Sequence, residues 1–96
     1  MNTRRNGTTS RQMVDSVKGS IYIWPEARSL DYAIRLAEYL GRTDLQIFSA
    51  SDLRYQDKFN GRKIYGLTVD HACYWLDRLG EREYETLRDI ESRIGA

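Results

Sequence analysis

The chain has few of the residues that stabilise small secreted or membrane-bound domains. It contains one cysteine, Cys73, and one proline among 96 residues. A single cysteine cannot form an internal disulfide, which small secreted domains commonly need. No stretch approaches the roughly 20 apolar residues that cross a bilayer, and residues 1–19 lack the apolar run of a secretory signal. These absences favour a cytoplasmic protein without a membrane anchor.

A surplus of either charge is also missing. Lys and Arg number 15 against 14 Asp and Glu, a net charge of +1, which excludes a strongly basic nucleic-acid coat and a highly acidic mimic. The balance is uneven, however. Residues 1–19 hold four basic and one acidic residue (+3), and the remainder holds 11 and 13 (−2). We interpret residues 1–19 as a basic, flexible arm and residues 20–96 as a single α/β domain.

Residues 20–96 alternate between short β-prone segments and helical patterns. Strands are predicted at residues 21–24, 45–48 and 63–69, and helices at residues 30–40, 71–79 and 81–94. The first two strands, joined through a helix of about three turns, have the spacing of a right-handed, parallel βαβ unit. We predict an α/β fold in the order β-α-β-β-α-α, with a small three-stranded, mainly parallel sheet packed against two to three helices. An Asn60-Gly61 turn could instead join residues 56–59 and 62–66 as a hairpin and make the sheet mixed.

The ends of the predicted strands carry the side chains most suited to a ligand, because parallel sheets bind ligands beyond their carboxyl ends. This possible ligand rim comprises Trp24, Glu26 and Arg28 after the first strand, Ser49, Ser51 and Asp52 after the second, and Asp70 and His71 after the third. Capping of helices and turns also explains the Ser and Asp residues. The first strand runs into Trp-Pro-Glu-Ala-Arg-Ser, without the glycines of a phosphate-binding loop. No cofactor is therefore predicted.

Catalytic and metal-binding patterns are weak. Asp70, His71 and Cys73 lie close together in sequence, but a metal site needs three or four ligands, and a helix points residues two apart in different directions. We interpret Cys73 as a packing residue and predict no metal site. A small hydrolase that uses Asp70 and His71 is the third-ranked hypothesis, and a non-enzymatic protein is favoured over it.

Seven tyrosines are many for this length. Tyr32 and Tyr39 share one edge of the first predicted helix, Tyr55 lies in the long loop, and Tyr74 projects from the second helix beside Arg78. Tyrosine and arginine are enriched where proteins bind each other. We therefore predict that these five residues contribute to a partner-binding surface, although some of the tyrosines must complete the core.

The helix Leu-Asp-Tyr-Ala-Ile-Arg-Leu-Ala-Glu-Tyr-Leu-Gly (30–41), set between two short strands and followed by a polar loop into Asn-Gly-Arg-Lys-Ile-Tyr-Gly-Leu (60–67), resembles small phage-encoded α/β proteins. These proteins are similar to nucleotide-binding domains that lack the phosphate loop. The resemblance covers about residues 20–70. It implies an accessory protein acting in an infected bacterial cell, with no catalytic residue to carry over.

Two functional hypotheses follow. The leading one is a non-enzymatic binding module, such as a phage accessory or inhibitor protein that engages a host protein. The alternative is a nucleotide or nucleic-acid binder that uses the rim, with Arg4, Arg5 and Arg11 contacting phosphate. The sequence also leaves a homodimer open.

Overall fold

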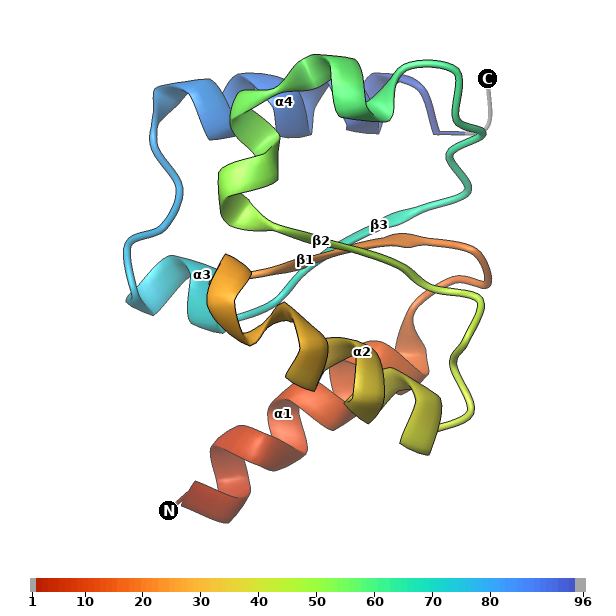
Figure 1. Cartoon of the computed structure of the whole chain (residues 1–96), viewed down its shortest axis with the longest axis vertical. Helices are drawn as coiled ribbons and strands as arrows, with labels where there is room; N and C mark the ends of the chain where they lie inside the picture. The colour runs from red at the N-terminus through yellow and green to blue at the C-terminus, as the bar shows by residue number, and fades with distance from the viewer. Residues whose placement is uncertain (1, 95–96) are drawn as a thin grey trace.

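A three-stranded sheet lies between two layers of helix in the computed structural model, which describes residues 2–94, with side chains from residue 8 onward (Figure 1). The strands and α-helices are α1 (Asn2–Asp15), β1 (Ile21–Trp24), α2 (Leu30–Tyr39), β2 (Gln46–Ser49), β3 (Leu67–Val69), α3 (Ala72–Trp75) and α4 (Glu81–Ser92). Three 3-10 helices are η1 (Ala27–Ser29), η2 (Ala50–Arg54) and η3 (Gln56–Phe59). The predicted α/β class is confirmed.

The sheet is entirely parallel, in the order β2-β1-β3. In the central strand, Ile21 is opposite Gln46 on one side and Leu67 on the other. The third strand is shorter than predicted. Its pairing with β1 begins where Leu67 lies opposite Ile21, and before that point the Gly66 carbonyl accepts a hydrogen bond from the Ile21 backbone N–H at 3.0 Å. The alternative hairpin is wrong. Residues 56–59 form η3, in which Phe59 is fully buried against Phe48, so this segment covers a face of the sheet rather than pairing with its edge.

The two faces of the sheet carry separate cores because side chains alternate along β1. Ile21 and Ile23 face the layer of η2, η3 and α4, where the core includes Leu53, Phe59 and Ile90. Tyr22 faces the opposite layer, where the core includes Met13 of α1, Ala33 and Ala37 of α2, and Leu45. Figure 1 shows α1 and α2 on one side of the sheet and α4 on the other.

The N-terminal segment, for which the sequence predicts a flexible arm, contains a helix. Most of it forms α1, and Met13 of that helix is fully buried in the core shared with α2. Gln12 donates a hydrogen bond to the Val69 carbonyl, and the Ser16 and Thr68 hydroxyl groups are hydrogen-bonded at 2.8 Å. Met13, Gln12 and Ser16 thus join the carboxyl half of α1 to the core and to β3.

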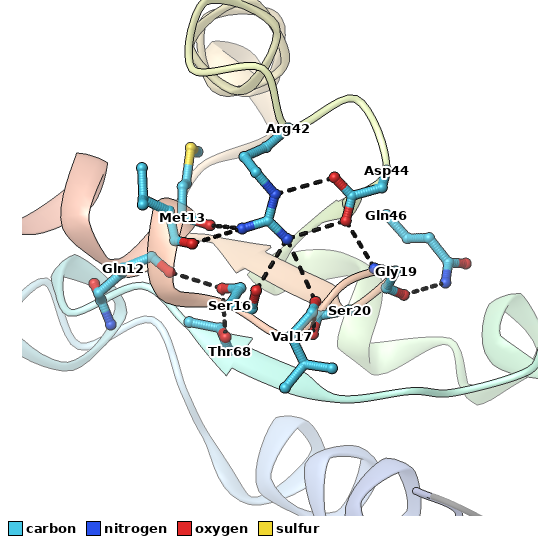
Figure 2. Close-up of polar contacts among 11 residues, drawn as sticks. Gln12, Met13, Ser16, Val17, Gly19, Ser20, Arg42, Asp44, Gln46 and Thr68 are labelled. Atoms are coloured by element: carbon cyan, nitrogen blue, oxygen red, sulfur yellow. Dashed lines mark hydrogen bonds and ion pairs between the residues drawn. The ribbon is translucent and has the colours of Figure 1, made fainter.

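Arg42 fixes the carboxyl end of α1 (Figure 2). Its Nη1 donates to the carbonyls of Met13 and Val14 at 2.6 and 2.8 Å, and its Nη2 donates to that of Ser16 at 2.9 Å. The last carbonyls of a helix have no partner within the helix, and they carry the negative end of its dipole. The guanidinium also forms a two-pronged ion pair with Asp44, at 3.0 Å for each contact. Arg42 therefore joins α1 to the loop before β2.

The predicted helix at residues 71–79 ends early, at Trp75. Asp77 adopts a left-handed conformation, with φ of 55°, which Asp tolerates better than most residues and which ends the helix. Trp75, the last residue of α3, is 54% exposed. Among residues 2–94, no helix combines the length and the apolar character that a membrane crossing requires.

Candidate functional site

All three strands end at the same edge of the sheet, as the rim hypothesis requires. Because the sheet is parallel, the segments after β1, β2 and β3 leave from this carboxyl edge (Figure 1). A cleft of about 310 Å³ opens there. It is lined by residues 25–28 after β1, by Ala50, Ser51 and Arg54 of η2, and by Arg78, which follows α3. Three of the predicted rim residues, Glu26, Arg28 and Ser51, therefore share one cavity.

Three arginines line this carboxyl-edge cleft. Arg28 has no ion-pair or hydrogen-bond partner for its side chain among residues 8–94. Arg78 Nη2 donates to Glu26 Oε2 at 2.9 Å, and both side chains are partly exposed. Arg54 Nε donates to Glu83 Oε2 at 2.7 Å. Glu26 is the one carboxylate in the lining, so the described walls carry a net charge of +2.

Glu83 orients Arg54. Its side chain is 6% exposed, and its second oxygen accepts a hydrogen bond from the Gly80 backbone N–H at the start of α4. The Arg54 hydrogen bond keeps the pKa of Glu83 below its usual range, against the opposing effect of burial. Only the Nε of Arg54 is engaged in this contact, so its two terminal nitrogens are left for a ligand.

Sequence reasoning missed Arg54 and placed Arg78 in a different site. The signal for Arg54 was a possible helical turn near residues 52–56, directly after the second strand. Such a turn, formed as η2, brings a side chain five residues beyond β2 back to the carboxyl edge. Arg78 lines the cleft directly after the left-handed turn at Asp77, which follows α3, and no local sequence pattern predicts that position.

Several other rim residues serve as caps and do not line the cleft. Asp52 accepts hydrogen bonds from the backbone N–H and hydroxyl of Ser49, which closes the capping box of η2. Partial burial raises the pKa of Asp52, but the hydrogen bonds from Lys58 and Ser49 outweigh burial, and the net shift is downward. Trp24 donates to the Ser29 hydroxyl at 2.8 Å and also does not line the cleft.

Asp70 is buried and fully engaged. The Tyr22 hydroxyl donates to its Oδ2 at 2.6 Å, and the Ala72 backbone N–H donates to its Oδ1 at 2.9 Å. Burial, and then the hydrogen bond to Asp70, raise the pKa of Tyr22 well above its usual range. His71 Nδ1 lies 3.4 Å from Asp70 Oδ1 and 3.2 Å from Gln12 Oε1. This cluster ties the end of β3 to α1.

The thiol of Cys73 is the one cysteine nucleophile in the chain, and it is inaccessible. Cys73 is fully buried, and its burial, helped by the charge of Asp70, raises the pKa of its thiol to about 12. A neutral, buried thiol is a packing group rather than a nucleophile. Across residues 8–94, no set of three or more His, Cys, Asp or Glu side chains is placed to hold a metal ion.

The predicted partner-binding residues are exposed but do not form one patch. Tyr32 and Tyr39 are 55% and 87% exposed on α2, and Tyr55 is 60% exposed between η2 and η3, across the sheet. Tyr74 is 55% exposed on α3. Burial raises the pKa of Tyr74, as does the nearby Tyr84, so this tyrosine is close to α4.

The residues assigned to nucleic acid lie on α1. The side chains of Arg4 and Arg5 are outside the described residues, whereas Arg11 is exposed on the helix surface and does not line the carboxyl-edge cleft. A comparison of this chain with protein-family models, with curated proteins and with solved structures finds no match.

Proposed function

We propose that this protein is a binding domain whose carboxyl-edge cleft holds a small ligand bearing a phosphate group. The observation that carries this proposal is the lining of the cleft. Arg28, Arg54 and Arg78 surround a space that contains one carboxylate, Glu26. Guanidinium groups match the geometry of phosphate oxygens and are common where proteins recognise phosphate. The volume of about 310 Å³ suits a small ligand.

The charge of neighbouring clefts supports a small ligand over a nucleic-acid strand. The cleft between α2 and β2 has one cation and one anion, and the two clefts that share Arg54 have equal numbers of each. The cleft at the start of α4 has two acidic residues against Arg88. A strand needs cations along its whole path. The surplus of positive charge here is local, as a single phosphate group requires.

The state of the candidate catalytic groups supports binding rather than turnover. Asp70 is held by Tyr22 and by the α3 backbone, and Cys73 is buried with a raised pKa. Neither residue lines the cleft. The charged groups that do line it are cations that can hold an anion, together with one carboxylate that is itself paired with Arg78.

The test uses protein with ¹⁵N-labelled arginine, titrated with inorganic phosphate and separately with adenosine 5′-monophosphate. We expect saturable shifts of the Nε resonances of Arg28, Arg54 and Arg78, with a dissociation constant on the order of 1 mM or below. Arg35, exposed on α2, is the internal control. Shifts of similar size at Arg35, or no saturation with either probe, would overturn the proposal.

Matched variants sharpen that test. Arg28→Gln should weaken binding about fivefold to tenfold, because it removes an unpaired cation from the cleft. Arg28→Lys keeps the charge but cannot form bidentate hydrogen bonds to phosphate, so we expect an affinity between those of the wild type and Arg28→Gln. Arg35→Gln makes the same charge change on α2, and unchanged binding is expected. Equal losses in Arg28→Gln and Arg35→Gln would show that general charge, and not the cleft, attracts the anion.

A protein partner is the second candidate, favoured by the exposure of Tyr32, Tyr39, Tyr55 and Tyr74. In this proposal the chain is a phage accessory or inhibitor protein that engages a host protein in the bacterial cytoplasm. Tagged wild-type chain, Tyr39→Ala and Tyr74→Ala would be compared as baits, with the exposed Tyr65→Ala as the control. A protein retained by wild type and by Tyr65→Ala, but lost from either other variant, is the expected result. Equal retention by all four baits would contradict this candidate.

A further inference from the structure

We infer that Glu26 is a competitor built into the cleft: its carboxylate occupies Arg78 in the free protein and is displaced when a phosphate group binds. This inference rests on the proposed function and concerns the regulation of the same site. It starts from a contrast between the two carboxylates that contact the arginines of the cleft. Glu26 and Glu83 each hold one guanidinium, but their surroundings differ.

The Glu83 carboxylate is held firmly in one position by burial and by two hydrogen bonds. Its side chain is 6% exposed, and both of its oxygens are engaged, one by Arg54 and the other by the Gly80 backbone N–H. Removing a buried carboxylate from such contacts is unfavourable. Glu83 therefore holds Arg54 in position whether or not a ligand is bound.

Glu26 is held much more weakly. Its side chain is 33% exposed, that of Arg78 is 44% exposed, and a single contact of 2.9 Å joins them. No other hydrogen bond of the Glu26 carboxylate is present among residues 8–94. Partly exposed single-contact ion pairs contribute little stability, because water solvates both partners well. Arg78 can therefore exchange this carboxylate for another oxyanion at low cost.

The position of Glu26 makes the exchange competitive. Glu26 lines the same cleft as the three arginines. Its negative charge therefore repels any anion that enters the cleft. Replacing it with glutamine keeps the size and one side-chain oxygen but removes the charge. The net charge of the lining then rises from the +2 of three arginines and one glutamate to +3. An anion should consequently bind more tightly to Glu26→Gln than to the wild type.

The same reasoning predicts discrimination by ligand charge. A singly charged carboxylate that replaces Glu26 exchanges one monoanion for another on Arg78. A phosphate dianion brings a second charge for the remaining cations, Arg28 and Arg54. The competitor should therefore select doubly charged oxyanions over monocarboxylates.

The experiment measures the dissociation constants of inorganic phosphate and of acetate at pH 7.5 in low salt, from arginine Nε shifts. It compares wild type, Glu26→Gln and Glu38→Gln. Glu38 is the matched control, because it is an exposed glutamate on α2 outside the cleft. We expect Glu26→Gln to bind phosphate about fivefold more tightly than the wild type, as one partly screened charge contact allows. Glu38→Gln should match the wild type within about twofold, because its charge is distant and screened.

The outcomes separate this inference from the proposed function. If the wild type binds phosphate but Glu26→Gln binds it no more tightly, or no more tightly than Glu38→Gln, the competitor role is wrong and the phosphate site stands. Acetate binding as tight as phosphate in the wild type would also refute the competitor, because selection by charge would be absent. If neither the wild type nor Glu26→Gln binds phosphate, the proposed function fails and the inference fails with it.

Discussion

Arginine has opposite roles at the two edges of the sheet. At the amino edge, Arg42 is 15% exposed, and its guanidinium is surrounded by acceptors from the end of α1 and by Asp44 (Figure 2). At the carboxyl edge, Arg28, Arg54 and Arg78 retain donors that the described protein does not use. The difference between the two edges shows that the number of acceptors around a guanidinium determines which of two roles it can have. A satisfied guanidinium stabilises the fold, whereas unsatisfied ones in a cleft can bind an anion.

Replacing the arginine at each edge with alanine tests this contrast most strongly. Arg42→Ala should lower the free energy of unfolding by about 3 kcal/mol, because it leaves several carbonyls of α1 and the Asp44 carboxylate without their partner. Arg28→Ala should change it by less than about 0.5 kcal/mol, since Arg28 has no partner to lose. Urea denaturation followed by circular dichroism measures both. Equal destabilisation by the two variants would show that the edges do not differ in this way.

A smaller effect is expected from pH at the amino edge. Hydrogen bonds from Arg42 and from the Gly19 backbone N–H lower the pKa of Asp44 in the folded protein, below the ordinary value of 3.8. The unfolded chain therefore binds the proton more readily, so this carboxylate stabilises the fold above about pH 4 and loses that effect as the pH falls. The contribution is about 1 kcal/mol, because the pair is partly exposed to solvent.

Asp44→Asn provides the measurement. We expect the stability difference between wild type and this variant to be largest near pH 7 and to shrink below about pH 4, in urea denaturation at a series of pH values. Asp57→Asn, an exposed carboxylate in η3 away from the amino edge, is the control. A difference between wild type and Asp44→Asn that persists unchanged at low pH would contradict the proposed role of the Asp44 charge.

Much of the fold was predictable from local patterns. β1 matches its predicted residues, and α2 ends within one residue of its prediction. The length of the connection from β1 through α2 to β2 correctly indicated parallel strands. The apolar pattern was less reliable near the carboxyl end of the chain. The helix predicted at residues 81–94 ends at Ser92, and Tyr84 and Ile94 are each 40% exposed. Ile94 therefore lies beyond the end of α4 and not on its buried face.

The candidate site was predictable in place but not in composition. Parallel strands imply a carboxyl edge, and Glu26, Arg28 and Ser51 were assigned to it from the sequence. The capping roles of Ser49, Asp52 and Asp70 follow from their own local contacts, and capping was the alternative interpretation of the Ser and Asp residues. Arg54 and Arg78 enter the cleft through the geometry of η2 and of the turn at Asp77, which involve segments far apart in the chain.

By itself, the sequence determined the order of the elements, the parallel βαβ unit and the edge at which a ligand could bind, because periodicity and connection length are local properties. Only the tertiary structure decided that Met13 of α1 packs in the core beside α2, and that three arginines from separate segments share one cleft with Glu26. The physical reason is the same in both cases. A side chain such as Met13 or Arg78 acquires its role from partners that are distant in sequence, and those partners become neighbours only when the chain folds.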